Sequence, residues 1–389
     1  MSRVKRMALI IAGLIVLVLV GLFFFVFNPL GLGPEPAVVL SQDFFEAPAQ
    51  DLSQLELLVN GEAAFTEILS AIDEARTSIH VQTYIWKDDQ IGRRVVDKLK
   101  HAADRTVSVT VRKDVLGTFF EIGDILKGKP SPVYTAVGLR NYTNIDVVTD
   151  VFADTDHSKY FIIDRQIAIF GGMNIADEYH KKWHDYMVAI RSARWAEVFA
   201  QKAIHAAPWP APAPFVVTVN NRKATEIRTA LIQVIDGAAE QLIIEHAYFS
   251  DNKVIAAVKR AAQRGVAVAV ILPERPDTHL YANRVTINKL LGAGAEAAPQ
   301  IYLYPRMSHA KVVLVDGVIA SVGSANLTPR SMVTSKELTL FAHGRKDDPF
   351  IQTLQRQLTQ DIRQCRRVDK PFKLSFIETI MAVAGKYIW

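Results

Sequence analysis

The second half of this 389-residue chain repeats the first half, and this repeat limits the possible folds more than any other feature. Residues 66–73, 78–84, 95–103 and 107–111 match residues 229–236, 241–248, 255–262 and 266–270, in the same order. The matched segments alternate between apolar residues at helical spacing and short β-branched runs, which predicts helix, strand, helix, strand in each unit. We therefore expect an α/β fold in which two similar α/β/α lobes pack as a pseudo-dimer.

Composition sets the boundaries of the expected domains. A Pro- and Ala-rich stretch at residues 206–214 separates the halves and is the natural linker. It leaves a first lobe at residues 55–205, a second lobe at 215–345 and a C-terminal segment at 346–389. Residues 28–54 are rich in Pro, Gly and Ala and are expected to form a tether.

Residues 1–27 have the features of a membrane anchor. Met7 to Phe27 are 21 consecutive uncharged residues, enough to cross a hydrocarbon core of about 30 Å as a helix. The run ends in a Phe-rich stretch with no small-x-small cleavage site, which argues against a signal peptide, and it has no polar stripe, which argues against a soluble helix. The basic residues precede the run, so we expect a cytosolic N-terminus and a catalytic domain on the far, periplasmic or extracytoplasmic, side of the membrane.

The remaining charge and the cysteine count exclude two classes. Arg3, Lys5 and Arg6 supply three of the net +5, which leaves 5 − 3 = +2 for the rest of the chain. This small excess of positive charge does not indicate nucleic-acid binding. Cys365 is the only cysteine, so an intrachain disulfide framework is excluded.

The repeat extends to a set of polar residues with equal spacing. Each half has a His, a Lys at +2, an Asp at +7, a small pair at +14 and +15, an Asn at +17 and a carboxylate at +28. The two sets are His157, Lys159, Asp164, Gly171-Gly172, Asn174 and Asp185, and His309, Lys311, Asp316, Gly323-Ser324, Asn326 and Glu337. A lone His is usually a solvated or core residue, but that explanation fails where each His has the same five partners.

The local pattern separates chemical residues from structural ones. Residues 160–163 and 312–315 are apolar and largely β-branched, so each motif lies on a predicted strand, where the Lys at +2 shares a face with its His. The odd offset points Asp164 and Asp316 to the opposite face, and Asp316-Gly317 is a hairpin-turn signature. We therefore predict that Gly172, Ser324 and these two Asp residues have structural roles.

The rest of the set suits phosphodiester chemistry. Lys159, Lys311, Asn174 and Asn326 would stabilise charge on the non-bridging oxygens of the transferred group. One neutral His can attack phosphorus and form a phosphohistidine, while the other protonates the leaving alkoxide and later deprotonates the acceptor. Asp185 and Glu337 would orient the imidazoles. We expect no cofactor and no metal, because the Lys beside each His would repel a cation.

The sequence resembles the phospholipase D superfamily, whose pattern H-x-K-x4-D-x6-G-[G/S]-x-N occurs here twice. Within it, the chain is most similar to bacterial cardiolipin synthases of the phospholipase D type. Support comes from residues 84–89, 114–117, 171–185, 248–251 and 323–331, and the resemblance covers residues 55 to 341. It implies one active site formed within the chain, phosphatidylglycerol as donor and acceptor, and His157 as the nucleophile, although symmetry alone does not distinguish the two histidines.

Several positions differ from that pattern and leave the substrate open. Asp154-Thr-Asp156 precedes His157 where a basic residue is usual, Thr328 replaces an Asp, and Arg105-Thr106 replaces Arg-Gly. The residues alone indicate phosphatidyl transfer or phosphodiester hydrolysis. The alternatives are a phospholipase D that releases phosphatidic acid and a membrane-tethered phosphodiesterase or nuclease; a catalytically inactive binding protein is disfavoured, because every motif residue is retained.

The C-terminal segment allows two interpretations. Arg363, Arg366, Arg367, Lys370 and Lys373 precede an apolar tail, a combination suited to an anionic membrane surface. A last helix packed on the domain with a solvated basic edge is equally compatible with the sequence.

Overall fold

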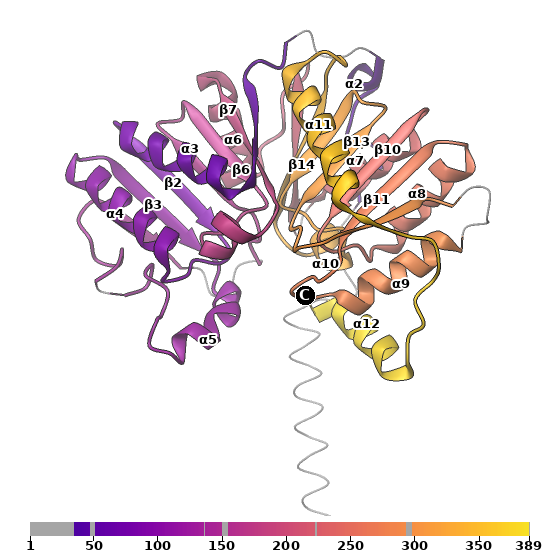
Figure 1. The fold of residues 1–389 in the computed structure, drawn as a ribbon. Coiled ribbons are helices and arrows are strands. Elements are labelled where there is room, and N and C mark those ends of the chain that lie inside the picture. The colour runs from indigo at the N-terminus through magenta and orange to yellow at the C-terminus, as the bar shows by residue number, and fades with distance from the viewer. Residues whose placement is uncertain are drawn as a thin grey trace, which may run out of the picture.

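Two α/β lobes face each other across a shared core (Figure 1). The computed structural model describes residues 35–46, 51–135, 137–149, 155–221, 224–292 and 298–388. The predicted anchor at residues 1–27 lies outside these ranges. No helix within them is both long and apolar enough to cross a membrane.

The first lobe contains a seven-stranded mixed sheet in the order β1-β7-β6-β5-β2-β3-β4. Its strands are β1 (Leu55–Val59), β2 (Ser78–Thr83), β3 (Ser108–Lys113), β4 (Ile145–Val148), β5 (Tyr160–Ile163), β6 (Ile167–Gly171) and β7 (Tyr186–Arg191). Its helices are α3 (Asn60–Glu74), α4 (Gln90–Asp104), η1 (Leu116–Glu121), α5 (Ile122–Ile125), η2 (Glu178–Lys182) and α6 (Ala193–His205).

The second lobe contains a nine-stranded sheet in the order β16-β12-β11-β10-β13-β14-β15-β8-β9. Its strands are β8 (Phe215–Asn221), β9 (Ala224–Thr225), β10 (Gln241–His246), β11 (Ala267–Pro273), β12 (Gln300–Tyr304), β13 (Lys311–Val315), β14 (Ile319–Gly323), β15 (Glu337–His343) and β16 (Arg366–Val368). Its helices are α2 (Gln42–Glu46), α7 (Glu226–Asp236), α8 (Asn252–Gln263), α9 (Leu280–Leu291), α10 (Pro329–Val333), α11 (Pro349–Gln364) and α12 (Phe376–Ile388).

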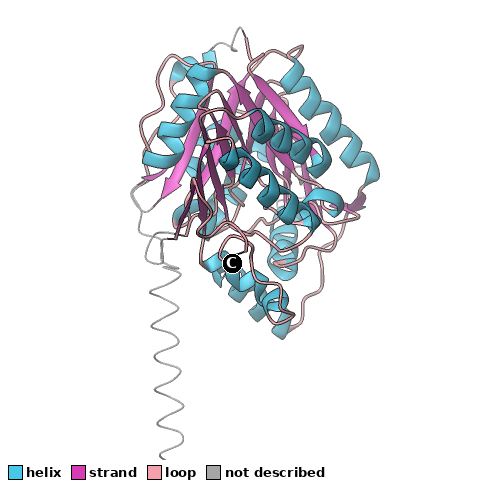
Figure 2. Ribbon diagram, turned by 90° about the vertical axis from the view of Figure 1, so that its left-hand side faces the viewer, coloured by secondary structure: helices cyan, strands magenta, loops and turns pink. Residues whose placement is uncertain are grey.

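The two sheets have the same topology, which confirms the prediction of two similar α/β lobes. The order β8-β15-β14-β13-β10-β11-β12 repeats β1-β7-β6-β5-β2-β3-β4, and β9 and β16 are added at the edges of the second sheet. The inner faces of both sheets, with α6 and α11, form one apolar core at the pseudo-twofold interface. The outer faces are covered by α3 and α4 in the first lobe and by α7, α8 and α9 in the second. Figure 2 shows these helical layers on the outside of the strands.

The structure agrees with the sequence alignment at the start of segments 78–84 and 241–248 but differs from it by one residue at their ends. Ile79 pairs with the residue before Asp164, and Leu242 pairs with the residue before Asp316, so these two β positions are equivalent. Counting forward from them, Tyr84 corresponds to Ala247 and not to Tyr248. The matched tyrosines at the ends of the sequence repeats therefore occupy different positions in the fold.

The described parts of the flanking segments pack on the second lobe. In the predicted tether, Leu40 and Phe44 are buried in the outer core of that lobe. In the C-terminal segment, β16 pairs antiparallel with β12, α11 contributes Leu354 to the inner core, and α12 packs against α9.

Candidate active site

Each His-x-Lys motif lies at the start of a central strand, at the edge of the sheet where β2 or β10 ends; His157 and Lys159 precede β5, whereas Lys311 is the first residue of β13. β5 begins at Tyr160 and runs antiparallel to β2, and β13 begins at Lys311 and runs antiparallel to β10. The apolar residues that follow each motif are buried on both faces of the sheet, which fixes the start of the strand. The two motifs therefore lie at matching positions on opposite sides of the pseudo-twofold axis.

Short backbone bridges join the two lobes beside each motif. His309 N donates to the carbonyl of His184 at 2.7 Å, and His184 N donates to the carbonyl of Met307 at 3.0 Å. In the same way, His157 N donates to the carbonyl of Lys336 at 2.9 Å. Since His184 and Lys336 directly precede Asp185 and Glu337, these bridges bring the carboxylate of one lobe to the histidine of the other.

The two His–carboxylate pairs are consequently exchanged between the lobes. Glu337 Oε1 lies 2.9 Å from His157 Nδ1, and Asp185 Oδ2 lies 2.7 Å from His309 Nδ1. Both carboxyl groups are buried. A carboxylate at Nδ1 fixes the orientation of the ring and directs its chemistry to Nε2. The sequence predicted that Asp185 and Glu337 orient the imidazoles, but it did not reveal this exchange.

The small residues at +15 are adapted to the carboxylate beside them. A Cβ on Gly172 would lie 2.4 Å from Asp185 Oδ1, so only glycine leaves room for the carboxylate. At the matching position, Ser324 Oγ donates to Glu337 Oε2 at 2.6 Å. The two lobes thus support a short and a long carboxylate by different means.

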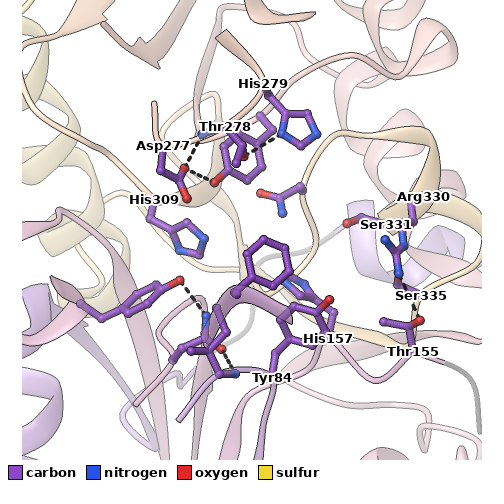
Figure 3. A pocket seen from close by; sticks show the side chains of 16 residues that line it. Tyr84, Thr155, His157, Asp277, Thr278, His279, His309, Arg330, Ser331 and Ser335 are labelled. Carbon is purple, nitrogen blue, oxygen red and sulfur yellow. Dashed lines mark hydrogen bonds between the residues drawn. The ribbon is translucent and has the colours of Figure 1, made fainter. Parts of the chain in front are cut away.

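Both histidines line one pocket between the lobes (Figure 3). His157 contacts the edge of the Tyr84 ring, with ring centroids 4.9 Å apart, and His309 contacts Tyr179 at 5.1 Å. Residues from both lobes complete the lining: Ile85, Phe120, Thr155, Asn174, Tyr248, Asp277, Thr278, His279, Asn326, Arg330, Ser331 and Ser335. The structure therefore contains one composite pocket, and each lobe contributes one histidine to it.

Burial sets the charge of the two histidines. It lowers the pKa of His157 to about 4 against the attraction of Glu337, and it lowers the pKa of His309 well below the usual range. Lys311 and Lys159 lower the pKa of His309 further. Burial thus favours the neutral form of both imidazoles, and the neutral form can act as a nucleophile.

Burial shifts the pKa values of Asp185 and of the two motif lysines, and their opposite charges partly oppose these shifts. Burial raises the pKa of Asp185 to about 7, although Lys311 opposes the shift. Burial also lowers the pKa of Lys159 to about 7 and that of Lys311 to about 8. Lys159 Nζ donates to the carbonyl of His157, and Lys311 Nζ lies 3.0 Å from His309 Nε2, so each Lys stands beside its own His as the spacing predicted.

The two asparagines line the pocket but differ in their bonds. Asn174 Oδ1 accepts from Ile85 N at 3.0 Å, and its amide donates to Tyr179 at 2.8 Å. Asn326 Oδ1 is buried and has no hydrogen-bond partner within the described ranges.

Asp164 and Asp316 lie away from the pocket, at turns where both have a positive φ of 52°. Asp164 accepts hydrogen bonds from the backbone N–H groups of residues 76–78, and Asp316 accepts them from residues 239–241. Each carboxylate thereby ties the turn after β5 or β13 to the segment that enters β2 or β10. These contacts are structural, as the odd offset from the histidines indicates.

Asp277, Thr278 and His279 are pocket residues that the sequence analysis missed. Tyr248 donates a hydrogen bond to Asp277, and its ring stacks on His279 with centroids 4.3 Å apart. The loop follows β11, a strand parallel to β10, so its position at the pocket edge was a usable signal. It has no counterpart in the repeated polar set, and for that reason the spacing did not reveal it.

A second buried polar cluster lies behind His309. Among the described residues, His184, Glu245 and Asp361 form the group whose possible metal-ligand atoms lie within 4.8 Å of one another. His184 Nε2 is 3.1 Å from Asp361 Oδ2, Tyr186 lies between His184 and both carboxylates, and Glu245 accepts from Ser308. Protein groups therefore satisfy this cluster, and it braces the bridge that carries Asp185.

Comparison with known proteins places this geometry in a family. The model described as "Cardiolipin synthase, PLD-like domain" matches residues 68–205 and 231–362, one copy for each lobe. The chain belongs to this family. It is thus an enzyme of the phospholipase D superfamily, a phosphatidyltransferase of that type.

Individual relatives agree with this membership. A cardiolipin synthase of Clostridium perfringens strain 13 is 27% identical over 354 residues, covering 81% of this chain and 72% of the relative. Cardiolipin synthase B of Salmonella typhimurium is 29% identical and covers 82% and 83%. The crystal structure of phosphatidylserine synthase from Haemophilus influenzae aligns with a TM-score of 0.67 at 15% identity, over 89% of this chain and 96% of that one. This last likeness shows the fold alone.

Proposed function

We propose that this enzyme joins two phosphatidylglycerol molecules into cardiolipin and releases glycerol. The observation that carries the proposal is the pair of exchanged His–carboxylate units at one pocket between the lobes. It supports a two-step transfer in which one imidazole attacks and the other handles the proton. The relatives named as cardiolipin synthases support cardiolipin as the product, and the resemblance to that family implies phosphatidylglycerol as donor and acceptor.

In the first step, His157 Nε2 attacks phosphorus and the bond from phosphorus to the glycerol oxygen breaks. His309 gives a proton to that oxygen, and glycerol leaves. In the second step, a hydroxyl of another phosphatidylglycerol gives its proton to His309 and attacks phosphorus. The phosphorus–nitrogen bond breaks, His157 is restored and the four-chain lipid is released. Lys159 and Lys311 stabilise the charge on the non-bridging oxygens throughout.

The environments of the two pairs favour this division of roles. Burial lowers the pKa of both histidines, so the neutral, nucleophilic form is favoured in each, and the carboxylates are what distinguish the two pairs. Asp185 has a pKa raised by burial to about 7 and is bonded to His309, so this pair can hold an extra proton near neutral pH. A group that keeps a proton near the working pH suits the general acid.

The reaction is tested with purified full-length protein and vesicles of phosphatidylglycerol. We expect glycerol release with accumulation of cardiolipin, and loss of both in His157→Ala and in His309→Ala. Release of phosphatidic acid in place of cardiolipin would establish hydrolysis. Cleavage of DNA without any reaction of lipid would establish a nuclease. Substantial turnover by either variant would contradict a single shared site.

We also propose that residues 7–27 anchor the chain, with the N-terminus in the cytosol and both lobes on the other side. The support is the 21-residue uncharged run and the three basic residues before it. Protease is added to cells whose outer membrane or cell wall has been removed and whose cytoplasmic membrane is intact. Under these conditions it should digest the two lobes. Digestion that requires lysis of the cells would refute this orientation.

A further inference from the structure

Exposed apolar side chains gather in two elements of the molecule. Among the described residues, nine of the eleven exposed large hydrophobic side chains lie between residues 119 and 126 or between 376 and 383. The remaining two are Val38 and Val137. Such clusters on a protein surface mark an interaction site more often than scattered exposed residues do.

The first cluster, which we name the α5 tip, consists of Phe119, Ile122, Ile125 and Leu126. Leu126 is 82% exposed and Phe119 is 61% exposed. Phe120, within the same segment, lines the active-site pocket. The α5 tip therefore begins at the rim of the pocket and extends away from it.

The second cluster, the α12 face, consists of Phe376, Ile377, Ile380, Met381 and Val383. These positions follow helical spacing and are all more than half exposed, whereas Ala382 on the packed side is 4% exposed. Among residues 376–385, the helix thus buries Ala382 and turns its large apolar side chains outward, the reverse of a helix that packs only on its own domain. α12 lies against α9 and α10, and α10 carries Arg330 and Ser331 of the pocket lining.

Both clusters lie at the same end of the molecule, one on each lobe. Figure 1 shows α5 and α12 at this end, on either side of the junction between the lobes. The described chain also begins here: Glu35 pairs with Lys253 at 2.7 Å, near the start of α8, which follows β10. Only seven residues separate Glu35 from Phe27, so the eight steps between them span at most about 29 Å. An anchor that ends at Phe27 would therefore end within this reach of Glu35.

Basic residues accompany both clusters. Lys127 and Lys129 follow α5, and Lys370 and Lys373 precede α12, all of them exposed. Apolar side chains with flanking lysines match the surface of an anionic phospholipid bilayer, where the apolar groups enter the acyl boundary and the ammonium groups meet the headgroups.

We infer that the α5 tip and the α12 face form a two-point docking surface for an anionic phospholipid bilayer. One point belongs to each lobe, and the pocket opens between them, so docking presents the pocket to lipid headgroups. The inference rests on the proposed function only in taking the bilayer as the source of substrate. The contact itself needs no catalysis.

The docking surface is tested by site-specific fluorescence on the full chain in phosphatidylglycerol vesicles. Leu126→Cys and Ile380→Cys are each labelled with an environment-sensitive fluorophore in a Cys365→Ser background. Gln352→Cys is the matched control, because Gln352 is exposed on α11 and lies with Asp316 at the end of the sheet opposite the pocket. A quencher is attached to the upper acyl chains of the lipid.

We expect the labels at 126 and 380 to be quenched at least about threefold more than the label at 352, and this quenching to be weaker in vesicles of zwitterionic phosphatidylcholine. Equal quenching at all three sites would overturn the inference. Labels at 126 and 380 that are not quenched would also overturn it. This outcome includes the case in which the two sites contact a second copy of the chain and not lipid.

A charged double variant separates docking from catalysis. Leu126→Asp with Ile380→Asp should lower turnover on vesicles at least about tenfold, yet leave turnover of a short-chain, monomeric phosphatidylglycerol unchanged. Gln352→Asp, at the opposite end of the molecule, should change neither turnover. Unaltered vesicle turnover in the double variant would refute the docking role. If no variant makes cardiolipin, the proposed function fails, and the quenching result still decides whether the surface meets lipid.

Discussion

The exchange of carboxylates predicts that Glu337 and Asp185 affect different chemical events. Glu337→Gln keeps the shape of the side chain but removes the charge that lies 2.9 Å from His157 Nδ1. A hydrogen bond to a charged group contributes about 2 kcal/mol, and we take its loss as the difference between Glu337→Gln and the wild type. That difference corresponds to about a 30-fold slower attack on phosphorus. Asp185→Asn should instead impair proton delivery by His309.

A substrate with an acidic leaving group distinguishes the two effects. Phosphatidyl-p-nitrophenol releases an aryl oxide that needs no proton, so its burst reports the attack step alone. We expect Glu337→Gln to slow this burst about 30-fold and Asp185→Asn to slow it less than about threefold. With phosphatidylglycerol, both variants should be slow, because the glycerol oxygen must be protonated.

The matched control is Ser324→Ala. It removes only the hydrogen bond to the other oxygen of Glu337, at 2.6 Å, and should cost about 1 kcal/mol, or about fivefold in the burst. The reverse pattern, in which Asp185→Asn slows the aryl burst and Glu337→Gln does not, would identify His309 as the nucleophile. Equal effects of both variants on the burst would refute the division of roles.

Three further predictions concern the scaffold and pH. Gly172→Ala places a methyl group 2.4 Å from Asp185 Oδ1, so we expect at least about tenfold lower turnover and a loss of about 1–3 kcal/mol in the free energy of unfolding, measured with denaturant. Asp164→Asn should lower the free energy of unfolding by about 2 kcal/mol without changing turnover per folded molecule. Partial burial acts to raise the pKa of Asp164, but backbone hydrogen bonds outweigh this effect and lower the pKa below 3.8. The stability advantage of the wild type is therefore present above pH 3.8 and is lost as the pH falls through the lower pKa of the folded state. Because burial raises the pKa of Asp185 to about 7 and lowers the pKa of Lys159 to about 7, turnover of phosphatidylglycerol should fall as the pH rises above about 7, as measured by initial rates across a pH series.

The repeat was enough to predict the lobes because it carries both periodicity and polar spacing. Residues that recur at fixed offsets, such as His157 and His309, must lie at equivalent places in two similar sheets. The same reasoning separated Asp164 and Asp316 from the chemical residues, since an odd offset from the histidine turns a side chain to the other face.

Contacts between the lobes could not be predicted in this way. The offset of +28 is measured along one lobe, whereas Glu337 meets His157 only through the bridge at Lys336 in three dimensions. The loop with Asp277 has no repeated partner, so nothing in the spacing indicated it. The match of Tyr84 with Tyr248 was misleading for a related reason, because two aromatic residues near the ends of equivalent strands occupy different positions.

Because the His–carboxylate pairs are exchanged, the catalytic chemistry depends on how the two lobes are placed relative to each other. His157 and Glu337 belong to different halves of the chain, and so do His309 and Asp185. Separating the lobes by an ångström or two would therefore leave both imidazoles without their counter-charges at the same moment. A small molecule that binds at the interface between the lobes, outside the pocket, and separates them would therefore inactivate both His–carboxylate pairs together.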